Sequence, residues 1–159
     1  MIELRFEDFH EQKYGEKAFR LYVVKNGFGD VLYVGISAVN VWKRWFGWGG
    51  HMTWDGNVIY GESAVGVKIE NHLPDSLDWM IQLWTLDDCI KFCVQELSGS
   101  ASEITIKDVE PIMVRKLSPA LNRTYNLTAG KDSTPMSQKE MDLAKKTDAA
   151  YRDIFDKKQ

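Results

Sequence analysis

The sequence predicts a small domain of the α+β class, and this prediction depends on length, composition and the order of elements. The chain has 159 residues, which corresponds to roughly one domain. Its composition is 44% hydrophobic and 27% charged, which is typical of a globular protein and excludes a disordered or fibrous chain. Strand-like and helix-like segments follow one another in the order β-β-α-β-α-α.

A β-hairpin is expected over residues 19–25 and 31–36. The two segments read FRLYVVK and VLYVGI, and both are rich in the aromatic and β-branched residues that favour strands. The residues between them, NGFGD, form a turn of the length that connects hairpin strands. The hairpin carries two tyrosines, Tyr22 and Tyr33.

Further strands and helices are expected after the hairpin. Ser37 is the candidate N-cap of the first helix, and Asp87 is the candidate N-cap of the second. The expected elements are a helix over residues 38–46, strands over 64–69 and 78–86, and helices over 88–97 and 107–117.

Residues 47–61 are expected to form a long surface loop. This stretch holds five glycines together with Trp48 and Trp54, and loops of this length are usually functional or disordered. Exposed tryptophans can stack on unpaired nucleic-acid bases, whereas buried ones would cover the core. The sequence leaves both roles open.

Residues 131–159 are expected to form a charged, amphipathic helical tail outside a domain over residues 1–130. The tail has seven basic and six acidic residues. Its apolar positions follow a helical spacing, so the tail is also a candidate surface for a homodimer.

The net charge of −3 argues against non-specific coating of nucleic acid, but the charge is unevenly distributed. Residues 70–110 hold nine acidic and two basic residues, whereas residues 111–130 hold three basic residues and no acidic ones. An acidic chain with a basic face can still act on DNA, provided that the acidic stretch faces away from the site.

The remaining features of the sequence suggest a cytoplasmic protein without a membrane partner. No apolar run approaches the ~20 residues of a membrane-spanning helix, and the N-terminus lacks an apolar signal core. Cys89 and Cys93, four residues apart, are expected to fill the core. His10 and His72 show no ligand spacing and are expected at the surface.

Glu110 is the most informative residue outside the hairpin. In a helix it would lie on a stripe with Met113 and Val114, where a carboxylate is costly unless a cation or donors meet it. The alternative is that Glu110 begins the helix and favours its dipole, with Pro111 at the first helical position.

Taken together, these motifs resemble the GIY-YIG nuclease family. The segment RLYVV at residues 20–24 stands in the place of the first motif, and YVG at residues 33–35 stands in the place of the second. Arg44 and His51 follow in the order that the family uses, and residues 110–122, EPIMVRKLSPALN, are similar to its closing signature. The resemblance covers about residues 19–124.

The resemblance implies a fold for residues 1–130, namely a small three-stranded antiparallel sheet flanked by helices. Residues 47–61 would be an insertion in this catalytic domain, and residues 131–159 would add an extra C-terminal helix.

The resemblance also implies metal-dependent hydrolysis of DNA phosphodiester bonds at a single divalent ion. Glu110 would hold Mg²⁺, with Mn²⁺ as a substitute, because Mg²⁺ keeps several waters and needs only one or two carboxylates. Arg44 would clamp a phosphate oxygen. Tyr22 is the candidate base for the attacking water. A free tyrosine titrates near ~10, so it needs a nearby cation or a relay through Tyr33 or His51.

Several roles stay open at this point. The division of labour between Tyr22 and Tyr33 is not fixed. Lys43 and Ser37 are candidate contacts to the DNA substrate. Asn122 would touch the phosphate or fix the site, or it would cap the C-terminal end of the last core helix.

Two departures from the family pattern keep alternative functions in view. The first motif lacks the glycine and isoleucine of the family name, and Pro111 directly follows the glutamate, where it could tilt the start of the helix. One alternative is therefore a nucleic-acid-binding module of the same fold that is catalytically degenerate. The other is a protein–protein interaction domain that uses the tryptophan-rich loop and the tail.

Overall fold

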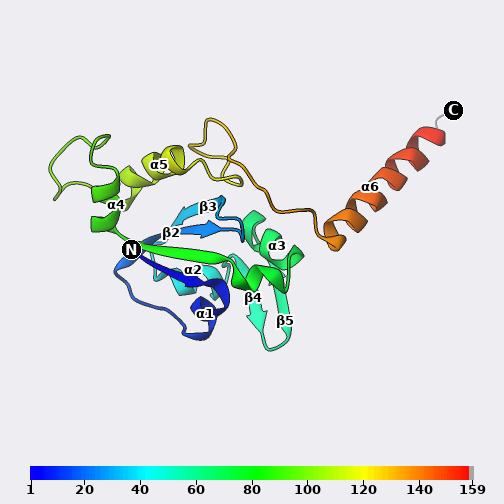
Figure 1. Cartoon of the computed structure of the whole chain (residues 1–159), viewed down its shortest axis with the longest axis horizontal. Coiled ribbons are helices and arrows are strands. Elements are labelled where there is room, and N and C mark those ends of the chain that lie inside the picture. Colours follow the sequence, from blue (N-terminus) through cyan, green and yellow to red (C-terminus); the bar gives the residue numbers. More distant parts are fainter. Residues whose placement is uncertain (158–159) are drawn as a thin grey trace.

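The computed structural model describes residues 1–157 and has the predicted α+β architecture (Figure 1). The strands of the main sheet are β1 (Ile2–Arg5), β2 (Phe19–Lys25), β3 (Val31–Ile36) and β6 (Met80–Thr85). They form one antiparallel sheet of four strands in the order β1-β6-β2-β3. The prediction of three strands was wrong because the short β1, which alternates apolar and charged residues, pairs with β6 and adds a fourth.

The described chain has six α-helices and one 3₁₀ helix. The helices predicted over residues 107–117 and in the tail are confirmed, and so is a shorter form of the helix after residue 87. The helices are α1 (Phe6–Glu11), α2 (Val41–Phe46), α3 (Ala64–Asn71), η1 (Asp75–Asp78), α4 (Leu86–Phe92), α5 (Ile106–Leu117) and α6 (Gln138–Asp156).

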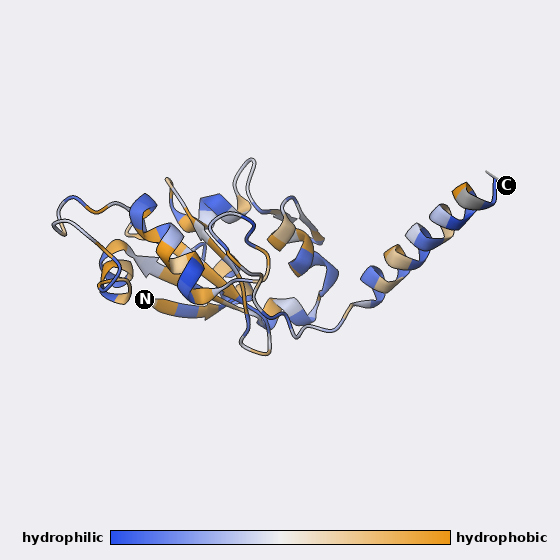
Figure 2. Cartoon of the chain, turned by 90° about the horizontal axis from the view of Figure 1, so that it is seen from above, coloured by the Kyte–Doolittle hydropathy of each residue, from blue (hydrophilic) through white to orange (hydrophobic). Residues whose placement is uncertain are grey.

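The main sheet separates two hydrophobic cores. One face, with Leu21 and Val23, packs against α4 and α5. The other face, with Tyr22 and Val24, packs against α1, α2 and the segments that follow α2. Figure 2 shows the hydrophobic residues gathered in the strands and on the helix faces that meet them. Alternate residues of β2 therefore belong to different cores, as the two-residue period of a strand requires.

Residues 64–69 form helix α3 and not the predicted strand. Val65 and Ile69 are buried at a helical spacing of four, although the alternation in AVGVKI imitates a strand. Ser63 caps the helix, with its hydroxyl accepting a hydrogen bond from the amide of Gly66 (3.2 Å). A Cβ at Gly66 would collide with the carbonyl oxygen of His51, so glycine allows α3 to approach that residue.

Residues 47–61 are not one long loop, because they contain the hairpin of β4 (Met52–Asp55) and β5 (Val58–Gly61). Gly56 has φ of 57°, which suits the tight turn between the two strands. The high glycine content of the segment hid this turn signal in the sequence. The hairpin forms a second, two-stranded sheet.

Two helix caps differ from the predicted ones. Asn40, and not Ser37, caps α2, because its side chain accepts a hydrogen bond from the amide of Lys43 (2.8 Å). Thr85, and not Asp87, caps α4 in a capping box with Asp88. In both cases a polar residue close to the predicted one makes the cap.

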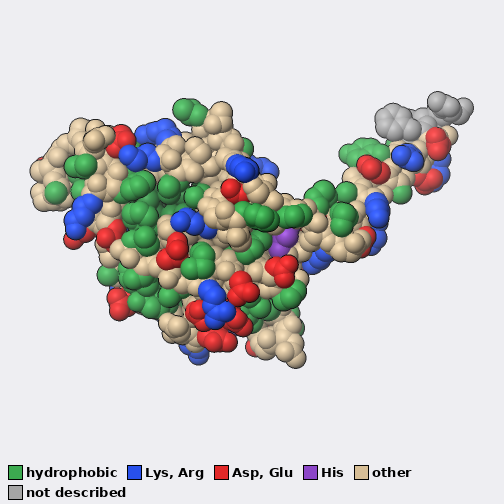
Figure 3. Space-filling view, in the orientation of Figure 1, with side chains coloured by type: hydrophobic (Ala, Val, Ile, Leu, Met, Phe, Trp, Pro, Cys, Tyr) green, Lys and Arg blue, Asp and Glu red, His purple; other side chains and the backbone are tan. Residues whose placement is uncertain are grey.

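The tail is fastened to the body at its start and then leaves it. Asp132 pairs with Lys68 (3.1 Å), and Lys139 pairs with Glu70 (2.7 Å). Beyond residue 140 the described side chains of α6 are exposed, and the helix projects from the body with apolar, acidic and basic side chains intermixed along it (Figures 1 and 3). The last two residues of the predicted tail, 158 and 159, lie outside the described residues.

Within residues 1–157, no helix combines the length and the apolar character that crossing a bilayer requires.

Candidate active site

Tyr22 lies at the centre of the candidate site, with its ring over Gly35. The two residues are paired across β2 and β3, and a Cβ at position 35 would collide with the phenol oxygen of Tyr22. Tyr22 is 1% exposed and packs against Trp45 and Tyr33, with ring centroids 5.6 and 6.2 Å away. The glycine of the YVG segment therefore makes the space that the tyrosine ring occupies.

His51 connects Tyr22 to helix α3 through both of its ring nitrogens. Nε2 lies 2.6 Å from the hydroxyl of Tyr22, and Nδ1 lies 2.7 Å from the hydroxyl of Ser63. His51 is 2% exposed, and its carbonyl oxygen accepts a hydrogen bond from the amide of Glu62 (2.8 Å). Sequence reasoning missed Ser63 because it treated the following residues as a strand, in which a serine has no N-cap role.

Burial keeps Tyr22 and His51 neutral. Burial, with the positive charge of Arg44 acting in the same direction, lowers the pKa of His51 to about 3. Burial also raises the pKa of Tyr22 above its usual range, with Tyr33 adding to the effect and Arg44 opposing it. Because a neutral imidazole has one donor and one acceptor nitrogen, Tyr22, His51 and Ser63 form a directional chain of hydrogen bonds.

Arg44 supplies the positive charge of the site. It belongs to α2, whose buried residue Trp45 fixes the helix against the sheet. Burial raises the pKa of Tyr33, and the charge of Arg44 opposes this effect. The guanidinium therefore lies within electrostatic reach of both tyrosines. Its Nη1 donates to the carbonyl of Gly49 (3.4 Å), and in residues 1–157 it forms no ion pair.

Tyr33 and Glu110 line a cavity of about 530 Å³ at the β3 edge of the sheet. The other walls come from Ala64 and residues 121–125. Within the described part of the chain, neither the hydroxyl of Tyr33 nor the carboxylate of Glu110 has a hydrogen-bonding partner or an ion pair. Both groups are therefore free to meet a ligand in this cavity.

Glu110 does not begin its helix. Helix α5 starts at Ile106 with Thr105 and Asp108 in a capping box, so Glu110 lies in the second turn and Pro111 lies inside the helix. The alternative in which Pro111 takes the first helical position is therefore wrong. The alternative relied on the preference of proline for that position, but the capping box that begins at Thr105, six residues before Pro111, sets the start of the helix.

The surroundings of Glu110 fit a hard divalent cation. Burial raises the pKa of Glu110, and a cation would offset that penalty. In residues 1–157 no three side chains of His, Cys, Asp or Glu gather into a metal-binding group. A single free carboxylate beside an open cavity suits Mg²⁺, which takes most of its ligands from water. Of the nine acidic residues in 70–110, Glu110 is the one that lines this cavity.

The three residues predicted to contact DNA lie in different environments. Lys43 is exposed on α2. Asn122 binds the backbone of Val34, with Oδ1 accepting from the amide (2.9 Å) and Nδ2 donating to the carbonyl (2.8 Å). Asn122 therefore fixes the cavity wall beside Tyr33. It does not cap α5, because the C-cap of that helix is Ser118 in the left-handed conformation. Ser37 is 2% exposed, and its hydroxyl has no partner in residues 1–157.

The two tryptophans of residues 47–61 have opposite environments. Trp48 is fully exposed between Gly47 and Gly49, so it is available to a partner. Trp54 stacks on His10 at a centroid distance of 3.7 Å and covers the core. His10 is therefore half-buried and not at the surface as expected, because Trp54 lies over it.

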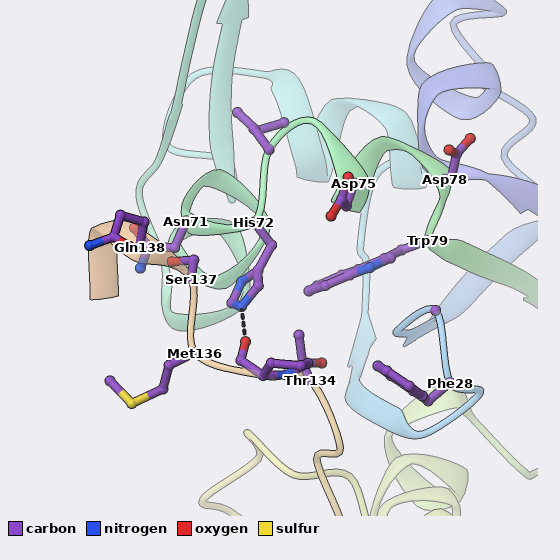
Figure 4. Close-up of a pocket in the computed structure, with 13 residues that line it drawn as sticks. Phe28, Asn71, His72, Asp75, Asp78, Trp79, Thr134, Met136, Ser137 and Gln138 are labelled. Atoms are coloured by element: carbon purple, nitrogen blue, oxygen red, sulfur yellow. Dashed lines mark hydrogen bonds between the residues drawn. The ribbon is translucent and has the colours of Figure 1, made fainter. Parts of the chain in front are cut away.

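A different cavity, of about 560 Å³, lies beside η1 and the start of the tail (Figure 4). Trp79, Asp75 and His72 contribute to its wall. The ring nitrogens of His72 lie 2.8 Å from the carbonyl oxygen of Lys68 and 3.0 Å from that of Pro135, so His72 is not the surface residue that was expected. Sequence reasoning missed this cavity because the tail closes it from a distant part of the chain.

Comparison with known proteins adds no relative to this description, since no protein-family model, curated protein or solved structure matches the chain.

Replacement of His51 by glutamine is expected to change how stability depends on pH. The pKa of His51 is about 3 when folded and 6.5 ordinarily, so between these values the unfolded chain binds a proton that the folded chain does not. Native stability should therefore fall as pH drops from 6.5 towards 3, by at most about 1.4 kcal/mol per pH unit from this residue. Urea unfolding of both forms at pH 7, 5 and 4 measures the effect. The stability advantage of the native protein over His51→Gln should shrink at each step, and an advantage independent of pH would contradict the assignment.

Proposed function

We propose that this chain is a divalent-metal-dependent endonuclease that hydrolyses DNA phosphodiester bonds by a single-metal mechanism of the GIY-YIG type. The observation that carries the proposal is the grouping of five side chains from five separate segments. Tyr22, Tyr33, Arg44, His51 and Glu110 influence one another through hydrogen bonds, ring contacts or charge. The group combines a cation, a free carboxylate and hydroxyl groups, which are the parts that phosphodiester hydrolysis needs.

Binding of the substrate is assigned to Arg44 and the cavity at β3. A phosphodiester is anionic, and Arg44 is a cation without an ion pair in residues 1–157, so it can bind phosphate oxygens by charge-assisted hydrogen bonds. Glu110 would hold the metal ion. When bound, Mg²⁺ supplies Lewis-acid stabilisation of the charge that develops on the phosphate and on the leaving oxygen.

The two tyrosines are assigned different tasks because they differ in exposure. The hydroxyl of Tyr33 lines the cavity without a partner, so Tyr33 is the group that contacts and orients the attacking water. Tyr22 is buried behind it, hydrogen-bonded to His51. Tyr22 and His51 position the ring of Tyr33, with ring centroids 6.2 and 5.6 Å away, and Ser63 holds His51 in turn.

Substrate binding would itself change the pKa of His51. Part of the lowering of the pKa of His51 comes from the charge of Arg44. An anionic phosphate bound to Arg44 would offset that charge, so the pKa of His51 rises when DNA is present. The imidazole then accepts a proton more readily with substrate in place than without it.

A second candidate function is a DNA-binding module of the same fold without turnover. The observation that favours it is the burial of Tyr22 and His51, because a raised pKa in the donor and a lowered pKa in the acceptor both oppose proton transfer. Exposed Trp48 is compatible with either function, since it can stack on a base for about 1–3 kcal/mol.

Replacement of Glu110 by glutamine is expected to reduce cleavage by roughly 10³-fold, because it removes the charged ligand of the metal ion. Stability should be unchanged or slightly raised, since the variant lacks a half-buried carboxylate without a partner. The measurement is cleavage of supercoiled plasmid and of branched and flapped oligonucleotides with Mg²⁺, Mn²⁺ or EDTA. Glu103→Gln, on an exposed loop, is the matched control.

Retained cleavage by Glu110→Gln would refute the metal assignment. If the folded native protein binds DNA in a salt-dependent manner but cuts none of these substrates with either metal, the binding module is the better description.

Phenylalanine substitutions at Tyr33 and Tyr22 are expected to separate catalysis from stability. Tyr33→Phe should slow cleavage about 10²–10⁴-fold at unchanged stability, because the hydroxyl contacts only the ligand. Tyr22→Phe should lower the free energy of unfolding by about 1–3 kcal/mol, because it leaves His51 without a buried partner. Urea unfolding and single-turnover cleavage on the same preparations give both quantities. If Tyr33→Phe cuts DNA at the native rate, the assignment of the two tyrosines is reversed.

The exposed part of α6 is proposed to pair with a second copy of the chain. Leu143, Tyr151 and Ile154 are more than half exposed, and every described side chain of α6 beyond residue 140 is exposed. An isolated helix of this length is marginal in water, so a partner would stabilise it. Removal of residues 143–159 should convert a dimer into a folded monomer, as measured by sedimentation velocity and circular dichroism. A monomeric native protein at micromolar concentration would refute this proposal.

A further inference from the structure

A further cavity is lined by basic side chains and takes no part in the proposed chemistry. It has a volume of about 410 Å³, and its charged lining residues are Lys17, Arg20 and Lys43. The remaining walls are Ala38, Val39 and Asn40, so no acidic residue lines it. Three positive charges around one cavity are notable in a chain whose net charge is −3.

The charges of this cavity are not neutralised by the protein. Within residues 1–157, none of the three cations forms an ion pair, whereas Arg5, Lys25 and other surface cations do. Three cations gathered around one cavity, with no carboxylate in its lining, raise the local positive potential. That potential favours an anionic ligand.

Arg20 is also held in a defined orientation. Its Nε donates to the carbonyl oxygen of Ser37 (3.0 Å), and the amide of Ser37 donates in turn to the carbonyl of Arg20 (2.9 Å). The Nη groups have no partner in the described residues. A half-buried guanidinium fixed through Nε and free at Nη retains the donors that phosphate recognition uses.

The position of the cavity connects it to the site at Tyr22. Arg20 precedes Tyr22 by two residues on β2, which is about 7 Å along a strand. Lys43 directly precedes Arg44 on α2. A strand of DNA with one phosphate at Arg44 could therefore reach this cavity with another phosphate.

We propose that the cavity lined by Lys17, Arg20 and Lys43 binds a phosphate group of the DNA substrate other than the one that is hydrolysed. The inference rests on the proposed function for the identity of the ligand, but binding is separable from cleavage. The phosphate is either an internal diester of the strand or a terminal monoester at a nick or an end. Both present the same anionic oxygens to the cavity.

The test is DNA binding by the full chain in EDTA, measured by fluorescence anisotropy over a range of salt concentrations. The variant is Lys17→Ala/Lys43→Ala, because both side chains are exposed and make no hydrogen bond within residues 1–157, so the fold should persist. The matched control is Lys91→Ala/Lys131→Ala, which removes two exposed positive charges outside the cavity. The probes are single-stranded and duplex oligonucleotides with a 5′-hydroxyl, a 5′-phosphate or a 3′-phosphate.

The cavity variant should bind about tenfold more weakly at 0.1 M salt. Its plot of log affinity against log salt should be shallower by about 0.7–0.9 for each phosphate that the variant no longer neutralises, and the control should match the native protein. Equal weakening for all probes identifies an internal diester, and loss of a native preference for one phosphorylated end identifies a terminal monoester.

Two outcomes would overturn the inference. One is binding by the cavity variant that equals that of the control, and the other is no DNA binding by the native protein. Cleavage by the native protein with unchanged binding by the cavity variant refutes the cavity and keeps the nuclease. Weakened binding by the cavity variant, with no cleavage by any form, keeps the cavity and refutes the nuclease.

Discussion

The buried hydrogen bond between Tyr22 and His51 is the interaction on which the rest of the candidate site depends. It joins the main sheet to the segment that leads into the β4–β5 hairpin, and through Ser63 it reaches helix α3. Two glycines make this geometry accessible. Gly35 admits the tyrosine ring, and Gly66 lets α3 approach the backbone of His51. A side chain at either position would separate the elements that the hydrogen bonds hold together.

Charge at the site is organised differently from charge in the whole chain. Arg5, Lys25, Lys68 and Lys116 form ion pairs with carboxylates. Arg44 has no ion pair in residues 1–157 and lies near Tyr22, Tyr33 and His51, which burial keeps uncharged. An unpaired cation beside neutral hydroxyl groups is costly unless an anion arrives. The net charge of the chain therefore says little about which kind of ligand binds, and the local arrangement of unpaired charges says more.

The parts of the fold that sequence reasoning predicted are those with strong local signals. The hairpin of β2 and β3 has β-branched residues and a glycine turn, and α5 has a regular apolar stripe. The missed parts depend on tertiary contacts. The short β1 becomes a strand by pairing with β6. Helix α3, whose sequence alternates like a strand, packs through Gly66 on the backbone of His51. Ser63 was missed with α3, since its hydroxyl is a cap only when a helix follows.

The departures from the GIY-YIG pattern acquire physical explanations in this fold. Leu21 stands where the family motif has isoleucine, and it is fully buried under α5, so it packs in the core as that apolar residue would. Arg20 stands where the family motif has glycine. It is half-buried, donates a hydrogen bond to the carbonyl of Ser37 and introduces a positive charge near the site. Pro111 lies inside α5, whose start is set by an earlier capping box, so Pro111 does not determine where the helix begins. Because each unusual residue has a structural use that leaves Tyr22 and Glu110 in place, these departures do not by themselves argue for a degenerate site. The stronger argument for a degenerate site is the burial of Tyr22 and His51, which is a property of the fold and not of the motif.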